Sequence, residues 1–552
     1  MLLDDTQVLS CLIEAAENVQ GYTVYMMKVQ RGQSEASWQV SRRYSDFDTL
    51  NNLLLCSGLD IPLPPKKLFG KLEREFVAER QQALQVYINF LLSHPLLSSS
   101  IHVKRFLDPA NYSFNFVETS LQHVSMVFRS EPQWEIAEPL LDFGWRIRKQ
   151  YFSIKSKNES KKRFVLSWTA LGPDQYLNEK DLSSAVKLLG SIKHPFILPV
   201  SMCCVSSNGA LVIYDFLENG SIRDYLCKTK PRTPFLKKYG NPKSFNAFEL
   251  SKIKTYGGQI LTALKFLHDR GFYHGSIQAG NVAIVDGQCK LLDVFNGVLG
   301  VPSFLRSHIS QLKGVQTVEN IDVYCFGHLM YEMTFGAPLY ETTCDNLPNS
   351  CSPDLRSLLL SILSKDGLKS GLPSITGLLQ HQFFVNSSNG TEKVHLKVSS
   401  QLKESLKNMK ELTQKRLKED QKMIRHSKRI SKVQAQLSCD EEKKKRSKEK
   451  RKINTELVNS TSSGERSHTP STPSVSEIDQ PLTPVSPPPP PPLPPPFFGD
   501  QNPIQSVQNG KPPSPMPVET GGGRTALLSS IQGFNKGALK KAETKDCSAP
   551  KV

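Results

Sequence analysis

The fold is decided by residues 273–282, which read YHGSIQAGNV. A second polar position, Asp293, follows within the sequence LLDVFNG. The amide oxygen of Asn281 and the carboxylate of Asp293 are ligands of the type that Mg²⁺ binds. The two residues are therefore a candidate site for a divalent cation. The alternative is that both are structural loop residues that make turn hydrogen bonds.

Residues 273–282 resemble the catalytic loop of the protein kinase family, His-Arg-Asp-Leu-Lys-Pro-x-Asn. Other kinase-like segments occur in the order that this family requires. They are HPFI at 194–197, after the regulatory helix, YDFLENGS at 214–221, at the hinge, and DVYCFG at 322–327 with YEMTFG at 331–336, in the core helix of the large lobe. The resemblance implies a bilobal protein-kinase-like fold over residues 135–388.

The same resemblance indicates which catalytic groups are missing. Ser276 stands at the position of the catalytic base, an aspartate that accepts the proton of the attacking hydroxyl, and a serine hydroxyl cannot take over that role. Trp168 stands where the family has its phosphate-pairing lysine, and the position of the partner glutamate falls near Ala185. Residues 143–145, FGW, supply one glycine in place of a glycine-rich phosphate loop.

These losses together predict a pseudokinase that has no catalytic residue and requires no cofactor. The base, the lysine and the phosphate loop each contribute several powers of ten to phosphoryl transfer, so neighbours are not expected to replace all three. The alternative is a divergent serine/threonine protein kinase with weak ATP-dependent activity. In that case Mg-ATP binds at Asn281 and Asp293.

The beginning of the chain contains residues suited to an anionic ligand. RRYSDF at 42–47 precedes IPLPPKK at 61–67, and EREFVAER at 73–80 predicts the start of an amphipathic helix. Guanidinium and ammonium groups bind phosphate, and a proline-stiffened loop presents its lysine at low entropic cost. The alternative is that the arginines are ordinary strand charges and the prolines form only a turn.

The three elements together resemble the phox homology (PX) family. This resemblance implies a three-stranded antiparallel sheet with helices over residues 1–115 and a phosphoinositide ligand, by default phosphatidylinositol 3-phosphate. The family's residues for the 3-phosphate, the inositol ring, a second phosphate and the ring hydroxyls correspond to Arg43, Tyr44, Lys67 and Arg80.

The positive charge of the chain is concentrated near its end. The net charge is +17, and residues 401–457 carry 19 Lys and Arg against 9 Asp and Glu. Residues 389–457 are predicted as a basic helical segment. The run KKKRSKEKRK at 443–452 has three interpretations: a solvated helix face, a patch for anionic membranes, or a nuclear address. Nucleic acid is not expected as a partner, because no recognition fold accompanies this charge.

The 11 cysteines contain no C-x-x-C pair, which argues against a zinc site or a disulfide framework. The first residues lack a basic leader before an apolar core, and no apolar run approaches the length of a membrane span. We therefore predict a cytoplasmic protein, and the PX resemblance implies that it is peripheral on an endosomal or plasma membrane.

Residues 458–523 are rich in Ser, Thr and Pro and are predicted to be a disordered linker. Within them, the proline run 487–496 is a polyproline II ligand for SH3, EVH1 or profilin-type proteins. A spacer is the alternative interpretation of this run.

The last segment of interest, 524–545, combines a short amphipathic helix with a basic tetrapeptide. It resembles the WASP-homology-2 motif, which implies binding to monomeric actin. The predicted actin-binding residues are Leu527, Leu528, Ile531, Phe534, Leu539, Lys540 and Lys541. The alternatives are a fortuitous amphipathic stretch or a helix that docks on the chain's own kinase-like lobe.

The whole pattern predicts a membrane-recruited scaffold or regulator. A lipid-binding domain and an actin motif flank a kinase-like lobe that binds other proteins. Analogy with PX-containing sorting proteins points to trafficking or regulation of membrane receptors or transporters.

Overall fold

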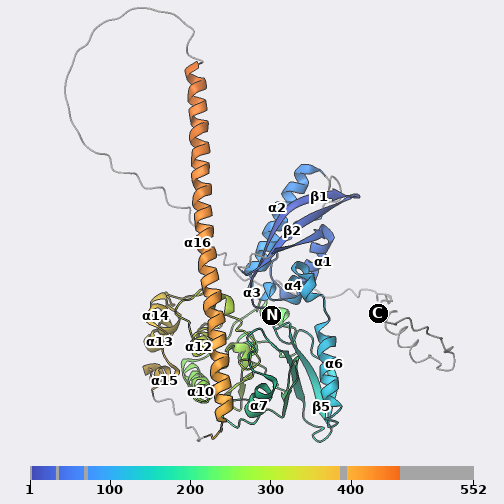
Figure 1. The fold of residues 1–552 in the computed structure, drawn as a ribbon, viewed down its shortest axis with the longest axis vertical. Coiled ribbons are helices and arrows are strands. Elements are labelled where there is room, and N and C mark those ends of the chain that lie inside the picture. Colours follow the sequence, from blue (N-terminus) through green and yellow to red (C-terminus); the bar gives the residue numbers. More distant parts are fainter. Residues whose placement is uncertain (1–2, 33–36, 67–72, 386–393, 460–552) are drawn as a thin grey trace, which may run out of the picture. The chain divides into compact units, whose positions relative to one another are not determined.

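The computed structural model describes residues 3–32, 37–66, 73–385 and 394–459, with the side chains of 434, 435 and 437–459 left out (Figure 1). The chain divides into two units, residues 1–462 and 463–552. The predicted linker from 460 onward, the proline run 487–496 and the actin motif 524–545 lie outside the described residues, so the predictions for them stand as they were made.

The first part of the chain is a three-stranded antiparallel sheet in the order β1-β2-β3, covered by helices. Along β1, Leu9, Cys11 and Ile13 are buried while the residues between them are exposed, as the alternation of a half-buried strand requires. The elements are β1 Leu9–Val19, β2 Tyr22–Arg31, β3 Ser37–Arg43, α1 Tyr44–Leu54, η1 Leu55–Ser57, α2 Arg74–Ser93, α3 Pro95–Ser98, α4 Ile101–Leu107 and α5 Pro109–Tyr112.

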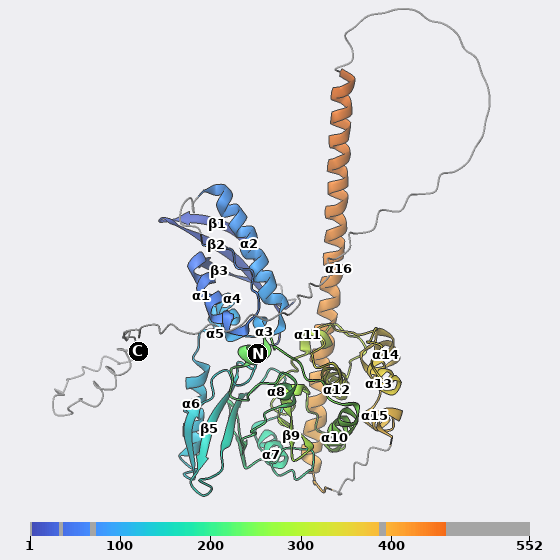
Figure 2. The ribbon, with the colours of Figure 1, turned by 180° about the vertical axis from the view of Figure 1, so that it is seen from behind.

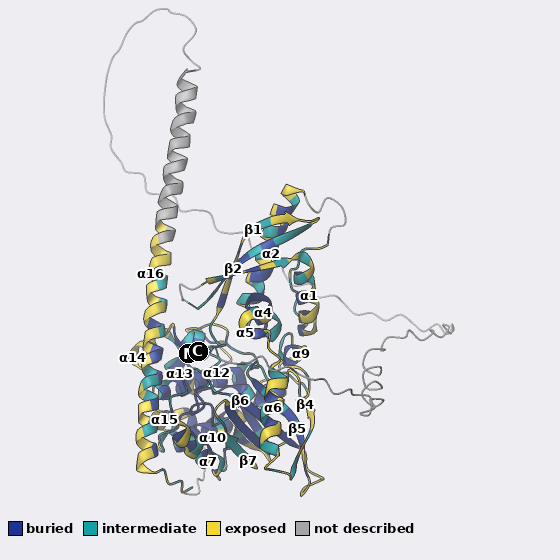
Figure 3. Ribbon diagram, turned by 45° about the vertical axis from the view of Figure 1, so that its right-hand side comes forward, coloured by how far each residue is buried: buried dark blue, intermediate teal, exposed yellow. Residues whose placement is uncertain are grey.

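A second, five-stranded antiparallel sheet follows, in the order β4-β5-β6-β8-β7. Helix α6 packs against one face of this sheet (Figure 2), and α7 packs in the core on the other face. Since β6 lies between these layers, almost its entire length is buried (Figure 3). The elements are α6 Phe116–Phe128, β4 Trp134–Pro139, β5 Lys149–Ser156, β6 Phe164–Ala170, α7 Glu179–Gly190, β7 Met202–Val205 and β8 Gly209–Asp215.

The remainder of the kinase-like region is mostly helical and is built around α12, Val318–Phe335, which is buried on nearly all sides. The other elements are α8 Ile222–Leu226, α9 Phe235–Tyr239, α10 Leu250–His268, η2 Ala279–Asn281, β9 Val282–Val285, β10 Gln288–Leu291, α11 Arg306–Ile309, α13 Pro353–Leu363, α14 Lys365–Ser370, α15 Ile375–Leu379 and η3 Gln382–Phe384. A strand-rich part followed by a helical part confirms the predicted PX-like and kinase-like folds.

Asp322 of α12 holds the loop 273–282 in place. Its carboxylate is fully buried and accepts hydrogen bonds from the backbone N–H groups of His274, at 2.9 Å, and Gly275, at 2.7 Å. It also lies 2.8 Å from Nε2 of His268 at the end of α10. Gly275 has φ +76°, a left-handed conformation that favours glycine. The sequence YHGS therefore folds over one buried carboxylate.

Helix α9 links the kinase-like region to the PX-like domain. Phe235 and Leu236 are 5% and 4% exposed, and they belong to the hydrophobic core of the PX-like domain. After α9, the side-chain amide of Asn241 donates to the carbonyl of Gly58 at 2.8 Å. A segment of the kinase-like region thus completes the core of the domain before it.

Helix α16, Ser400–Asn459, packs on the kinase-like fold through its first turns. Leu402, Leu406, Met409 and Leu417 are buried at helical spacing, which gives the apolar stripe that such a contact needs. The helix also forms ion pairs, from Lys410 to Glu319 and from Arg306 to Asp420. Within the described ranges, no helix combines the length and the apolar character that crossing a bilayer requires.

We expect Asp322→Ala to lower the free energy of unfolding by about 2 to 6 kcal/mol, because each buried N–H left without a partner costs about 1–3 kcal/mol. Urea denaturation of the full chain measures this loss. Asp269→Ala removes a half-exposed carboxylate at the end of α10 and is the matched control. Equal stability of the two variants would contradict the role of Asp322.

We also expect a pH effect from His328 of α12. Burial lowers its pKa from 6.5 to about 3. Between these values the unfolded chain binds more protons than the folded chain, so the free energy of unfolding falls as the pH is lowered through this window. Between pH 7 and pH 5, the free energy of unfolding should fall by about 2 kcal/mol less in His328→Gln than in wild type. This figure corresponds to about 1.4 kcal/mol for each pH unit below 6.5. His426→Gln, at an exposed site on α16, is the control; parallel curves for wild type and His328→Gln would refute the prediction.

Candidate functional site

The first candidate site lies where α1, the proline loop and α2 of the PX-like domain meet. The guanidinium carbon of Arg80 lies 4.4 Å from the centroid of the Tyr44 ring, and its Nη2 donates to the carbonyl of Pro65 at 2.9 Å. The hydroxyl of Tyr44 donates to the carbonyl of Pro64 at 2.5 Å. The structure therefore brings together two of the predicted ligand residues and the loop that precedes Lys67.

Arg80 is a buried cation, with 8% of its surface exposed. Its Nε has no hydrogen-bond partner, and no carboxylate among the described residues forms an ion pair with it. Burying a charge without an opposite charge beside it is costly, and an anion at this site would offset that cost. Phe76, whose ring centroid lies 4.2 Å from the Arg80 guanidinium, is a second aromatic wall that the sequence analysis did not select.

The two neighbouring arginines at the end of β3 have different roles. Arg42 donates from Nη2 to the carbonyl of Phe106 at 2.6 Å, which makes it a structural residue. Arg43 is exposed and lies 5.0 Å from the ring centroid of Tyr22, and among the described residues no carboxylate pairs with its guanidinium. Arg43 directly precedes Tyr44, so the side chain that the PX resemblance selects is the one accessible to a ligand.

The fourth predicted residue, Lys67, lies outside the described residues. Its neighbour Lys66 forms an ion pair with Asp48 at 2.7 Å, and this hydrogen bond raises the pKa of Lys66. Lys66 was not selected from the sequence. The PX resemblance assigned the phosphate to the last lysine of the loop, and the ion pair explains why its neighbour is already engaged.

The second candidate site is the cleft beside the loop 273–282. The amide nitrogen of Asn281 donates to the carbonyl of Ser276 at 2.8 Å, and the imidazole of His274 contacts the carbonyl of Leu292 at 2.7 Å. Asp293 follows with φ +58°, a conformation that aspartate tolerates better than most residues. Asn281 and Asp293 thus line the cleft together with Ser276, which is buried.

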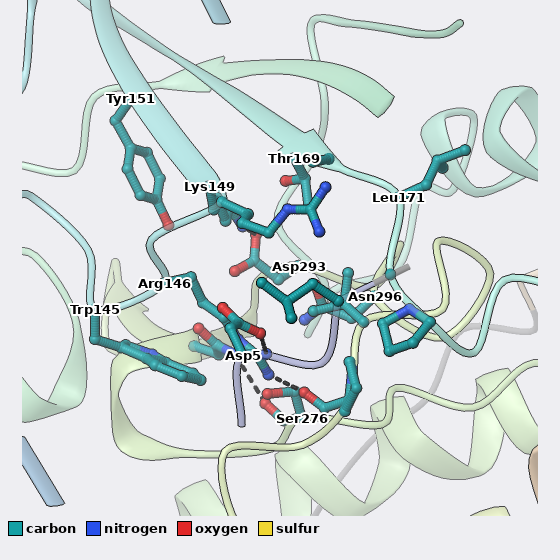
Figure 4. A pocket seen from close by; sticks show the side chains of 18 residues that line it. Asp5, Trp145, Arg146, Lys149, Tyr151, Thr169, Leu171, Ser276, Asp293 and Asn296 are labelled. Carbon is teal, nitrogen blue, oxygen red and sulfur yellow. Dashed lines mark hydrogen bonds and ion pairs between the residues drawn. The ribbon is translucent and has the colours of Figure 1, made fainter. Parts of the chain in front are cut away.

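A lysine that the sequence analysis missed reaches this cleft from β5. Nζ of Lys149 lies 2.5 Å from Oδ1 of Asp293 (Figure 4), and Lys149 is 7% exposed. In the sheet it is the register partner of Thr169 on β6. The kinase resemblance places its lysine on β6 alone. The sequence signal that could have identified Lys149 is a lysine at the cleft end of the strand next to β6.

The structure corrects the position of Trp168. Its ring stacks on His123 of α6 at 4.8 Å, within the hydrophobic cluster that covers the outer face of the sheet. Thr169, one residue later, lines the cleft. Since alternate residues of a strand face opposite sides, Trp168 does not occupy the place of a cleft lysine. Ala185 is fully buried on α7, and β6 contains no lysine at all.

The cleft is nearly filled in this conformation. Its cavity has a volume of about 40 Å³ and is lined by Lys149, Thr169, Asn281 and Asp293, together with residues from the beginning of the chain. Sites for small ligands generally have about 300–1,000 Å³. No cluster of three or more His, Cys, Asp or Glu side chains suited to a metal occurs in the part of the chain that the structure describes.

Comparison with known protein families agrees with this architecture. Residues 30–110 match the PX domain, residues 154–384 the protein kinase domain, and residues 520–549 the WH2 motif. A PX domain followed by a kinase fold with serine at the position of the catalytic aspartate defines the class of PX-linked pseudokinases.

The family follows from one relative. The chain is 50% identical, over 437 residues, to the PX domain-containing protein kinase-like protein of Mus musculus, covering 79% of this chain and 75% of the mouse protein. The chain belongs to the PX domain-containing protein kinase-like protein family.

Two more distant relatives match parts of the chain. The Slowpoke-binding protein of Drosophila melanogaster is 33% identical over 218 residues, which are 38% of this chain and 42% of the relative. The probable inactive serine/threonine-protein kinase slob1 of Dictyostelium discoideum is 29% identical over 297 residues, 49% of this chain and 50% of the relative. These names agree with the prediction of a pseudokinase.

Proposed function

We propose that the protein is a membrane-recruited scaffold that binds a phosphoinositide through its PX domain and actin through its WH2 motif. The observation that carries the lipid part is the buried guanidinium of Arg80, which faces Tyr44 and has no carboxylate partner among the described residues. A phosphate supplies the missing negative charge, and the exposed Arg43 adds a second cation beside it. The default ligand is phosphatidylinositol 3-phosphate on an endosomal or plasma membrane.

The kinase-like lobe acts in this proposal as a surface for protein partners. Ser276 has no carboxylate with which to accept a proton, and its 2% exposure leaves it little access to a substrate. A relative of part of this chain is named Slowpoke-binding protein, which supports a binding role. We infer regulation or trafficking of membrane receptors or transporters as the process. The proline run 487–496 adds partners of the SH3, EVH1 or profilin type.

The second candidate function is a divergent protein kinase with weak ATP-dependent activity. One observation favours it: Lys149 brings to the cleft the cation that β6 lacks. The missing base argues against it, because a lysine does not replace the carboxylate that accepts the proton of the attacking hydroxyl.

Arg43→Ala and Arg80→Met should each weaken binding to vesicles that contain phosphatidylinositol 3-phosphate by about tenfold or more. A charged hydrogen bond contributes about 1.5–3 kcal/mol, and 1.4 kcal/mol corresponds to a factor of ten. Liposome flotation with the full chain measures the affinity. Arg74→Ala, an exposed arginine on the same helix as Arg80, should bind as wild type does. Wild-type affinity in the Arg43→Ala variant would end the lipid proposal.

The double change Lys540→Glu and Lys541→Glu should weaken binding of the full chain to monomeric actin by about tenfold or more, because it reverses two charges in the basic tetrapeptide. Thermophoresis with labelled actin monomers gives the affinity. Lys511→Glu reverses one lysine charge outside the 520–549 match and is the control. Unchanged actin binding by the double variant would show that the motif resemblance does not carry function here.

A further inference from the structure

The beginning of the chain lies inside the kinase-like cleft. Leu3 and Asp5 line the same cavity as Lys149, Asn281 and Asp293. Oδ1 of Asp5 is 3.8 Å from Nη1 of Arg146, and Figure 4 shows Asp5 beside Arg146; Ser276 lines the same cavity. With this segment in place, the cavity has a volume of about 40 Å³.

A buried ion-pair network fixes the segment. Arg416 of α16 donates from Nη2 to Asp4, at 2.6 Å, and from Nη1 to Asp174, at 2.6 Å. Asp4 is 5% exposed and also accepts hydrogen bonds from the backbone N–H and the hydroxyl of Thr6. Burial alone raises the pKa of Asp4, but Arg416 and the Thr6 hydroxyl lower it, and the net direction is downward. At neutral pH Asp4 is therefore ionised, and its contacts with Arg416 and Thr6 fix its position.

The charges around the cavity are those of a phosphate site. Arg146, Arg148 and Lys149 line it, and the anions that face them are Asp293 and Asp5. Arg146 is 9% exposed and also donates to the carbonyl of Pro302. If Asp5 left, a buried arginine would lose its carboxylate, and an anion of similar size would restore the pairing.

We propose that residues 3–6 form an acidic plug in a nucleotide site in which Lys149, from β5, takes the place of the lysine that β6 lacks. The residues present fit such a ligand. Lys149 and Arg146 suit the phosphates, and the oxygens of Asn281 and Asp293 suit the divalent cation that accompanies them. Plug and Mg-nucleotide compete for the same cations, so the nucleotide binds only when the plug leaves.

The proposal does not depend on lipid or actin binding, or on phosphoryl transfer. When only a small fraction of the molecules is free of the plug, the apparent dissociation constant for the nucleotide equals the intrinsic constant divided by that fraction. Weakening the plug should therefore tighten nucleotide binding, and removing Lys149 should abolish the gain. Both effects are measured as binding.

The test is isothermal titration of the full chain with ATP in the presence of Mg²⁺. Asp4→Asn with Asp5→Asn should lower the dissociation constant by about tenfold or more relative to wild type. Adding Lys149→Met to this double variant should return the affinity to the wild-type value or below. Asp60→Asn, an exposed aspartate of the PX domain, is the control and should bind as wild type does.

Two outcomes would overturn the proposal. Either the double variant binds Mg-ATP no better than wild type, or its gain survives Lys149→Met. Circular dichroism and the melting temperature without ligand establish that each variant is folded. If the double variant is not folded, Asp5→Asn alone is measured by the same criteria, because Asp5 is the less buried of the two aspartates.

Discussion

The buried carboxylate of Asp322 is the interaction on which the kinase-like fold depends. It lies on the most buried helix and binds two consecutive backbone N–H groups of the loop 273–282, together with His268. Through this loop it fixes Ser276 and Asn281, and the contact of His274 with the carbonyl of Leu292 extends the order to Asp293. The geometry of a kinase cleft is thus maintained although the residue for proton transfer is absent. Architecture and catalysis are separate properties here.

The cleft lacks the lysine that kinases have on β6 and contains a lysine from β5 instead. Strand β6 contains no lysine, and Ala185 of α7 is apolar and buried, so the ion pair that kinases form between this strand and this helix has no counterpart here. Lys149 approaches Asp293 from the adjacent strand instead. Paired residues on neighbouring strands of an antiparallel sheet lie on the same face. A lysine on β5 can therefore reach the same point in the cleft as a lysine on β6 would.

Both folds could be predicted from the sequence because their marker residues are close neighbours in the chain. Arg43 and Tyr44, or Ser276 and Asn281, form short patterns that need no knowledge of tertiary contacts. The position of Trp168 was wrong because a shift of one residue along a strand moves a side chain to the opposite face. Lys149 was missed because the lysine was sought on β6 alone, whereas the contact of Asp4 with Arg416 could not be predicted, because it joins residues that only the folded chain brings together. The assignments of Lys67 and of the actin-binding residues rest on resemblance alone.

Helix α9 has a consequence for how this protein can evolve. Phe235 and Leu236 belong by sequence to the kinase-like region but by packing to the PX core. If recombination replaced the PX domain by another domain, these two side chains would be exposed to water. The PX domain, in turn, would lose two residues of its hydrophobic core. The two regions should therefore be inherited as one piece, and their substitutions around α9 should be correlated across lineages.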